Sequence, residues 1–308
     1  MKSNSWKLMV SAVVILLGLA LFSNSGCDSN SNSGTPTKVS GGGTGGSPTT
    51  VSGSSCTVTA NTSDSTTITS GCYLLNRNAS SCNASRTALG LTGAWQKFSC
   101  NVSMALTVSG GATFVQLTSQ NLPDYTSNYF TSSSPCYVAF TTSFPDPNVI
   151  AAQSVTVDVP LNPGSVGSAM SLGIVGMAID GVVIYDNQAA PGDNIFDELG
   201  SFDECQGHPD VSSLYHYHTE PYAISHDDDN LIGVMRDGYF IYGRLDPSGA
   251  PGSLDTAGGH TSATVDSATP VYHYHLNLQT GVNTAGVTVS GWFLTTGNYH
   301  GTPGYKYP

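Results

Sequence analysis

The segment Ile174-Val-Gly-Met-Ala-Ile-Asp-Gly-Val-Val-Ile-Tyr185 is repeated without gaps as Leu231-Ile-Gly-Val-Met-Arg-Asp-Gly-Tyr-Phe-Ile-Tyr242. In both copies an Asp-Gly pair stands between two apolar stretches. Such a pair favours a type I′ turn that joins two antiparallel strands. The tetrapeptide Tyr-His-Tyr-His at residues 215–218 returns at residues 272–275, at the same offset of 57 residues (237 − 180 and 272 − 215). We therefore expect a β-rich fold with an internal duplication.

A third element lies between the hairpin and the Tyr-His-Tyr-His motif in each copy. Asp203-Glu-Cys-Gln-Gly-His208 resembles Asp255-Thr-Ala-Gly-Gly-His260 in the pattern Asp-x-x-x-Gly-His, with a small shift in spacing. We predict two repeat units, residues 174–218 and 231–275, related by pseudo-twofold symmetry within one antiparallel β domain.

The repeated histidines suggest a metal site. Successive side chains of a strand point to opposite faces, so both histidines of Tyr-His-Tyr-His share one face and both tyrosines share the other. The two histidines stand ~6.5–7 Å apart along the strand, so their imidazoles can lean onto one ion, and the Gly-His pair can supply a third nitrogen. We expect the tyrosines to be partly buried with hydrogen-bonded hydroxyls. The candidate metal ligands are His208, His216, His218, His260, His273 and His275.

Two acids accompany these histidines. Asp203 and Asp255 begin the Asp-x-x-x-Gly-His elements, and each could hydrogen-bond a ligating histidine or act as a fourth ligand. The repeat allows two equivalent sites or one binuclear site between the copies. A structural role for the duplicated histidines, in a hydrogen-bonded core, is the alternative.

Composition also indicates an all-β protein. Only 10% of the 308 residues are charged, against ~25% in a typical domain, and glycine is abundant. This composition excludes a helical bundle or a coiled coil. Alternating segments such as Ser154-Val-Thr-Val-Asp-Val159 are typical of strands, and turn residues separate them at short intervals.

The N-terminal residues resemble an export signal. Lys2 and Lys7 precede an apolar run, residues 8–22. This run is shorter than the ~20 residues of a membrane span. Asn24-Ser-Gly-Cys27 resembles a bacterial lipoprotein cleavage box with Cys27 as the lipidated residue. We expect a signal peptide at residues 1–27 and a flexible Ser/Gly/Thr linker at residues 28–55. The protein is then a cell-surface or periplasmic lipoprotein, with the lipid as its sole membrane contact, or is secreted if the lipid is absent.

The remaining cysteines are expected to form disulfides, because the chain is exported. Residues 56–113 hold four of them (Cys56, Cys72, Cys82 and Cys100) and are predicted to form a small β module stapled by two disulfides. Residues 114–308 are predicted to form the larger, duplicated β domain. Cys136 and Cys205 could pair with each other, unless Cys205 is a metal ligand.

The chain is acidic, with a formal net charge of −12, which makes nucleic acid a poor partner. A negative field attracts cations instead. Asp227-Asp-Asp229, after His226, could bind Ca²⁺. These acids lack the spacing of a calcium loop, so a solvated loop is the favoured interpretation. No partner is predicted for His300.

Taken together, the two Tyr-His-Tyr-His motifs, the Asp-Glu-Cys-Gln-Gly-His box and the Ile-Gly-x-x-x-Asp-Gly-x-x-Ile-Tyr segment resemble the YHYH domain family of exported proteins. The resemblance extends from about Val115 to Gly301. It includes Asn121-Leu-Pro-Asp-Tyr125, which is similar to an Ile-Pro-Asp-His segment of the family, with Tyr125 in the place of the histidine. The resemblance implies no established activity, so the functional expectations rest on the residues themselves.

These features predict an exported metal-binding protein. Copper is expected ahead of zinc, because Cu²⁺ competes most strongly among divalent first-row ions for imidazole. Ligating imidazoles must be neutral, so binding should weaken below about pH 6. Two other classes stay open. One is a metal-dependent hydrolase or oxidase of unknown substrate, with Asp203, Glu204 or Asp255 as general base. The other is a structural or adhesive surface module.

Overall fold

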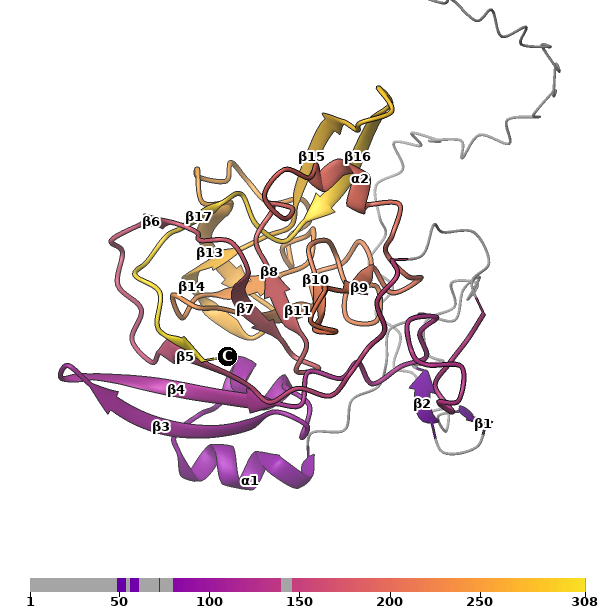
Figure 1. Cartoon of the computed structure of the whole chain (residues 1–308). Coiled ribbons are helices and arrows are strands. Elements are labelled where there is room, and N and C mark those ends of the chain that lie inside the picture. Colours follow the sequence, from indigo (N-terminus) through magenta and orange to yellow (C-terminus); the bar gives the residue numbers. More distant parts are fainter. Residues whose placement is uncertain (1–48, 54–55, 61–71, 73–79, 140–145, 308) are drawn as a thin grey trace, which may run out of the picture. The chain divides into compact units, whose positions relative to one another are not determined.

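The computed structural model describes residues 49–53, 56–60, 72, 80–139 and 146–307, and Figure 1 shows how their elements are arranged. Among these residues strands dominate, and the helices are α1 (Ser80–Ala88), α2 (Ile195–Glu198) and the 3-10 helix η1 (Gly93–Lys97). The expected signal peptide, Cys27 and residues 28–48 of the expected linker lie outside the described residues. None of the helices in the described ranges has the length and apolar character needed to cross a membrane.

The largest sheet has eight strands in the order β13-β14-β12-β11-β7-β8-β10-β9. The strands are β7 (Ile174–Ala178), β8 (Val183–Tyr185), β9 (Gly207–Pro209), β10 (Tyr215–Tyr217), β11 (Leu231–Met235), β12 (Phe240–Tyr242), β13 (Gly259–Thr264) and β14 (Ser267–Tyr274). The pairs β7–β8 and β11–β12 are the two hairpins that the Asp-Gly segments predict. β7 and β11 pair antiparallel and join the two hairpins.

The strand order reads the same from either edge when β7 is matched with β11, β8 with β12, β10 with β14 and β9 with β13. β10 runs parallel to β8, and β14 runs parallel to β12. The sheet is therefore mixed, so the antiparallel prediction holds for its other pairs and is wrong for these two. The cause lies in the connection, because the chain leaves β8, passes through α2 and β9, and returns beside β8 in the same direction.

The turns of the two hairpins are not of the predicted type I′. That type needs positive φ at both central residues, but in these turns only glycine has it, at Gly181 (φ 92°) and Gly238 (φ 91°). The Gly181 N–H donates to the carbonyl of Ala178, and the Ala178 N–H donates to the carbonyl of Val182. Each loop thus has three residues and ends in a left-handed glycine, which is the next most common hairpin geometry.

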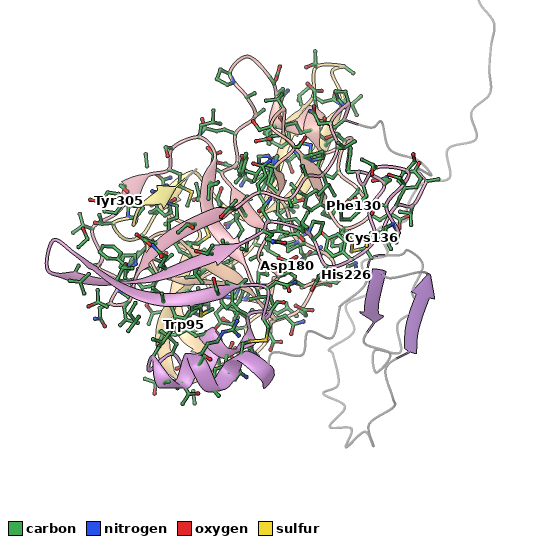
Figure 2. All side chains as sticks on the ribbon, turned by 60° about the horizontal axis from the view of Figure 1, so that its bottom comes forward. Trp95, Phe130, Cys136, Asp180, His226 and Tyr305 are labelled. Atoms are coloured by element: carbon green, nitrogen blue, oxygen red, sulfur yellow. A yellow bond between two sulfur atoms is a disulfide. The ribbon has the colours of Figure 1, made fainter. Side chains whose placement is uncertain are left out.

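A four-stranded sheet supplies a second layer. It consists of β18 (Lys306–Tyr307), β5 (Val155–Pro160), β4 (Ala112–Ser119) and β3 (Ser103–Ser109), in this order. Its buried Leu117 shares one hydrophobic cluster with Met177 and Val234 of the large sheet. Trp95 of η1, which is labelled in Figure 2, belongs to the same cluster. Its ring meets that of Phe240 edge-on, with ring centroids 4.9 Å apart. This hydrophobic cluster packs against one face of the large sheet.

Three short antiparallel pairs complete the described elements. β15 (Asn277–Val282) pairs with β16 (Thr288–Phe293), and β6 (Ser168–Ala169) pairs with β17 (Asn298–Tyr299). β1 (Thr49–Gly53) pairs with β2 (Cys56–Ala60). β1 falls within the segment expected to be a linker.

The expected front module, residues 56–113, contributes to the core of the larger domain. β3 pairs with β4 along its whole length, and β4 in turn pairs with β5. The expected boundary after residue 113 falls inside β4.

Disulfides connect the same parts of the chain. Cys82 pairs with Cys100, and Cys72 pairs with Cys205. The expected pairing of Cys205 with Cys136 is therefore wrong, and so is the alternative that Cys205 is a thiolate metal ligand. The expectation of two disulfides within residues 56–113 is wrong as well, because Cys72 pairs outside that segment. Both Cys72 and Cys205 are buried in the hydrophobic core, which brings their side chains together. Cys136 is disulfide-bonded as well.

Candidate metal centres

The six predicted histidines gather in two separate groups. Within the large sheet, His216 of β10 stands directly opposite His208 of β9, and His273 of β14 stands opposite His260 of β13. The last histidine of each motif follows one residue after its strand segment, on the same face. The first cluster is His208, His216 and His218, and the second is His260, His273 and His275 together with Asp246. The ligand atoms within each cluster lie within 4.8 Å of one another.

In the first cluster, both histidines of the Tyr-His-Tyr-His strand are anchored through Nδ1. His216 Nδ1 lies 3.0 Å from the carbonyl oxygen of Leu214, and His218 Nδ1 lies 2.6 Å from that of Asp186. A carbonyl oxygen only accepts hydrogen bonds, so each Nδ1 carries the proton and each Nε2 keeps its lone pair. The two Nε2 atoms nevertheless lie only 3.1 Å apart.

His208 has the same tautomer. The Ser201 hydroxyl donates its proton to the carbonyl oxygen of Glu198 at 2.8 Å, so at its 2.8 Å contact with His208 Nδ1 the hydroxyl oxygen accepts. His208 Nε2 is buried and has no hydrogen-bond partner among the described residues. Leaving a buried polar atom unsatisfied costs about 1–3 kcal/mol, which a bound ligand would recover.

Burial keeps these three imidazoles neutral. It lowers the pKa of His208 and of His218 to about 3, and that of His216 well below the usual 6.5, and a neighbouring ring adds to each shift. At neutral pH no proton separates the converging Nε2 atoms. Three neutral imidazoles that share a focus are a ligand set for zinc, copper or a related ion.

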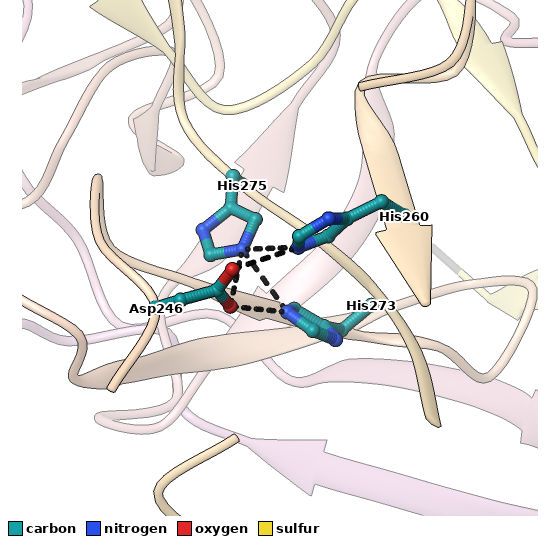
Figure 3. A group of neighbouring side chains, drawn as sticks. All are labelled: Asp246, His260, His273 and His275. Carbon is teal, nitrogen blue, oxygen red and sulfur yellow. Dashed lines mark hydrogen bonds and ion pairs between the residues drawn. The ribbon is translucent and has the colours of Figure 1, made fainter. Parts of the chain in front are cut away.

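The second cluster has a fourth donor. Figure 3 shows the Asp246 carboxylate among His260, His273 and His275. His273 and His275 again contact backbone carbonyl oxygens through Nδ1, at 2.9 and 2.8 Å, and their Nε2 atoms lie 3.0 Å apart. His260 Nε2 lies 3.2 Å from His275 Nε2. The paired Nε2 atoms of His273 and His275 therefore match those of His216 and His218.

The Asp246 carboxylate touches all three histidines of its cluster. Its Oδ2 lies 3.2 Å from His260 Nε2, and its Oδ1 lies 3.3 Å from His273 Nε2 and 3.4 Å from His275 Nε2. Although burial raises the pKa of Asp246, a hydrogen bond from Ser262 and the nearby histidines bring it below its usual value. Donors about 2.0–2.1 Å from a tetrahedral ion stand about 3.3–3.4 Å from one another. The contacts of this cluster are close to that spacing.

The first cluster lines a cavity of about 400 Å³. Glu198 lines it too, and its Oε2 lies 3.4 Å from His218 Nε2 and 3.8 Å from His208 Nε2. Burial, followed by the charges of neighbouring acids, raises the pKa of Glu198 to about 7. A carboxyl group with a strongly raised pKa in a cavity is a common feature of functional sites.

The tyrosines of the first motif occupy the opposite face of β10, as the alternation predicts. Tyr215 Oη donates to Asp203 at 2.7 Å, and Tyr217 Oη donates to Asp180 at 2.8 Å. Tyr125 is fully buried and lies 3.1 Å from Tyr215 and 2.5 Å from Tyr217 through the three hydroxyl oxygens. Tyr125 thus closes a buried network of three tyrosine hydroxyl groups.

The second motif repeats these tyrosine–aspartate pairs. Tyr272 Oη lies 3.0 Å from the Asp255 carboxylate, and Tyr274 Oη donates to Asp237. Asp203 and Asp255, which were expected beside the histidines, therefore bond tyrosines on the other face, and the structure does not bring them to either cluster.

The Gly-His pairs are explained by the same tyrosines. A Cβ atom on Gly207 would lie 2.5 Å from Tyr215 Oη, and one on Gly259 would lie 2.5 Å from Tyr272 Oη. Only glycine leaves room for the tyrosine side chain at these positions, so each glycine before a cluster histidine supports the tyrosine network.

The other candidates lie elsewhere. The ring of His226 meets Tyr222 edge-on, with centroids 4.7 Å apart, and the following acids form no ligand group with other acids, cysteines or histidines of the described chain. His300 stacks on Tyr272 and places Nδ1 3.3 Å from Asp255.

The sequence does not indicate two carboxylates that lie beside the histidines, those of Asp246 and Glu198. Asp246 has Ala189 as its counterpart in the first unit (246 − 57), so the repeat gives no signal for it. Glu198 belongs to α2, outside every repeated element. The sole hint of either residue is the general excess of acids in this part of the chain.

Comparison with known proteins identifies one family. The model of the family described as YHYH protein matches residues 156–250. This range is shorter than the resemblance inferred from the motifs. It includes the first cluster and Asp246 but ends before His260. No curated protein and no solved structure matches the chain. Residues 156–250 of this chain are therefore a domain of the YHYH protein family.

Proposed function

We propose that this protein is an exported, lipid-anchored metal-binding protein whose two histidine clusters each hold one divalent transition-metal ion. The observation that carries the proposal is the contact of each motif Nδ1 with a backbone carbonyl oxygen, from which the position of the proton follows. In each Tyr-His-Tyr-His motif both imidazoles hold their proton on Nδ1, yet their Nε2 atoms lie 3.1 Å apart in the first cluster and 3.0 Å apart in the second. Two lone pairs at this distance repel each other, and a metal ion at their focus turns that repulsion into coordination.

Two sites fit better than one binuclear site. The ligand groups are separate, and each contains three histidines of its own repeat unit. The symmetrical strand order and the matching tyrosine–aspartate pairs support an origin by duplication.

The metal preference differs between the clusters. Copper remains our first choice for the three-histidine cluster, because Cu²⁺ binds imidazole most tightly. For the second cluster the donor positions favour zinc. His275 Nε2 lies 3.0, 3.2 and 3.4 Å from the other three donors. In a square-planar site with bonds of about 2.0 Å, one of those distances would be about 4 Å, whereas a tetrahedral zinc site has none so long.

The location follows from the export features. Disulfides form and persist outside the cytoplasm, and the described chain contains two complete ones. Together with the lipoprotein-like box at Cys27, they support a protein tethered at the outer side of a membrane.

Metal content tests the proposal directly. The full chain, purified without a histidine tag, is loaded with Cu²⁺ or Zn²⁺, dialysed and measured by inductively coupled plasma mass spectrometry. We expect two ions per chain, and one ion in His216→Ala or in His273→Ala. His226→Ala, which belongs to neither cluster, is the matched control and should retain two. Folded protein that retains neither metal would contradict the proposal.

A metal-dependent enzyme is the second candidate. It is favoured by the cavity at the first cluster, into which a substrate could bring a carbonyl or similar group beside the ion and Glu198.

A further inference from the structure

The two clusters differ in how completely they surround an ion. In the second cluster Asp246 is within 3.4 Å of all three histidines, so four protein donors enclose the focus. In the first cluster the nearest carboxylate, Glu198, approaches His218 and His208 but makes no ion pair with His216 within the described structure. Glu198 therefore lies to one side of the three converging nitrogens. Three protein donors with an open fourth position are typical of reactive metal sites, and four are typical of structural ones.

The open side of the first cluster faces the cavity of about 400 Å³. A cavity of this volume is within the range that holds small organic ligands. Tyr185, which stacks on His216 with ring centroids 3.9 Å apart, forms part of its wall. The unpartnered His208 Nε2 is buried at the same place. The position left free by the protein is thus next to space that a ligand can enter.

The cavity also has a definite charge. Its lining contains four carboxyl groups and neither lysine nor arginine; the acids are Asp146, Asp193, Glu198 and Asp210. Asp210 accepts a hydrogen bond from Tyr185 at 2.9 Å, which fixes its carboxylate in the wall. Four ionised carboxylates outweigh the +2 charge of a bound ion, so the cavity attracts cations and repels anions, and the effect is stronger in a cleft than on an open surface.

We propose that the first cluster is the ligand-binding centre: a small neutral or cationic molecule with a nitrogen or oxygen donor enters the cavity and occupies the open coordination position. The second cluster is closed by Asp246 and holds its ion for stability. This inference rests on the proposed metal binding and adds to it the class of ligand and the division of roles.

Cobalt-loaded protein provides the test, because the visible absorption of Co²⁺ changes when its coordination changes. The full chain is loaded with Co²⁺ and titrated with three probes: pyridine, 4-(aminomethyl)pyridine and isonicotinate. The three share one donor nitrogen and are neutral, cationic and anionic at pH 7.5. Their para substituents cannot chelate the ion that the ring nitrogen binds. Metal content is measured on the same samples before and after titration.

We expect pyridine and its cationic derivative to change the spectrum of one of the two bound ions, and isonicotinate to bind at least about tenfold more weakly than the cation, given several nearby carboxylates. The response should vanish in His216→Ala and persist in His273→Ala. If either variant fails to fold, the wild-type amplitude, a change in one ion of two, carries the same information. Asp193→Asn should reduce the preference for the cation over the anion by about two- to fivefold.

The outcomes separate the two proposals. Two bound Co²⁺ ions without any spectral response, a response from both ions, or tighter binding of isonicotinate would overturn this inference and leave metal binding intact. Failure of the folded protein to retain Co²⁺, Cu²⁺ or Zn²⁺ would overturn both.

Discussion

The proton positions of individual histidines decide what the clusters can bind. In each Tyr-His-Tyr-His motif the partner of Nδ1 is a backbone carbonyl oxygen, such as that of Asp186 for His218. A partner of this kind fixes the tautomer and the ring orientation of a metal ligand. Because the oxygen belongs to the main chain, side-chain substitution at the partner residue leaves it in place. The backbone therefore directs the Nε2 lone pairs of each motif toward one point.

The buried histidines should make the metal-free protein sensitive to acid. The pKa values of His208 and His218 are about 3 in the folded chain, against 6.5 for an unperturbed histidine. Between these values the unfolded chain binds more protons, so folding stability is greatest above pH 6.5 and falls as the pH decreases. The pKa values of Asp203 and Glu198, which burial raises to about 6 and about 7, act in the opposite direction. The lowered pKa values of His216, His273 and His275 add to the effect of the first two histidines. The urea midpoint of chelator-treated protein should be lower at pH 5 than at pH 7.5, and an unchanged or higher midpoint would contradict this account.

The contribution of each tyrosine–aspartate bond to stability should depend on how deeply its aspartate is buried. Tyr217→Phe removes a donor from Asp180, which is 1% exposed, and should lower the free energy of unfolding by about 1–3 kcal/mol. Tyr272→Phe removes the donor from Asp255, whose side chain is 41% exposed and can bond water instead, so its cost should stay below about 1 kcal/mol. Urea unfolding of both metal-loaded variants gives the comparison. Equal decreases in the free energy of unfolding would show that burial does not determine how much these hydrogen bonds contribute to stability.

At the scale of elements, the clusters are built by two hairpins, β7–β8 and β11–β12, and by the strands β10 and β14 that run parallel to β8 and β12. Local sequence was sufficient for the hairpins, because an Asp-Gly pair between apolar stretches acts over a few residues. The repeat also indicated the six histidines that gather in the two clusters, and their role as metal ligands stays a prediction. Local sequence was not sufficient for the parallel pairing of β10 with β8, because that depends on how the chain crosses back between Asp186 and Leu214. The positions of Asp203, Asp246 and Glu198 depend on the same non-local contacts. For that reason the sequence pattern predicts the wrong face for Asp203 and does not indicate Asp246 or Glu198.

Two glycines with positive φ, one in the β11–β12 turn and one in the turn after Asp246, offer a matched test of packing. Gly238 and Gly249 both have positive φ, 91° and 114°, so an alanine is strained at either position. A Cβ on Gly238 would also lie 2.4 Å from the carbonyl oxygen of Pro160, whereas nothing lies within 4 Å of a Cβ on Gly249. We expect Gly249→Ala to cost about 1 kcal/mol and Gly238→Ala about 1–3 kcal/mol more. Thermal unfolding in a scanning calorimeter measures the difference, and equal costs would contradict the contact between the β11–β12 turn and β5.

At the scale of the whole molecule, disulfides join distant parts of one core. The Cys72–Cys205 bond spans 133 residues and reaches the Asp-x-x-x-Gly-His element of the first cluster, whereas Cys82–Cys100 spans 18. The long link therefore connects the expected front module to the sheet that carries the histidine clusters. The short link closes a loop within that module.

The two disulfides should differ in their contribution to stability. In the chain-entropy model, removal of Cys72–Cys205 by double replacement with serine should cost about 5 kcal/mol and removal of Cys82–Cys100 about 3 kcal/mol. The first replacement should in addition weaken metal retention at the first cluster while the second leaves it unchanged. Guanidinium unfolding and metal analysis of both variants test this, and a larger loss from the short link would contradict it.

Anomalous X-ray diffraction from crystals loaded with Zn²⁺ or Cu²⁺, collected at the absorption edge of the metal, tests the central claim most directly. We predict two anomalous peaks per chain, each about 2.0–2.1 Å from three histidine Nε2 atoms, with Asp246 as the fourth ligand at the second site and a non-protein ligand at the first. Metal-loaded crystals with no anomalous peak at either cluster would contradict the account.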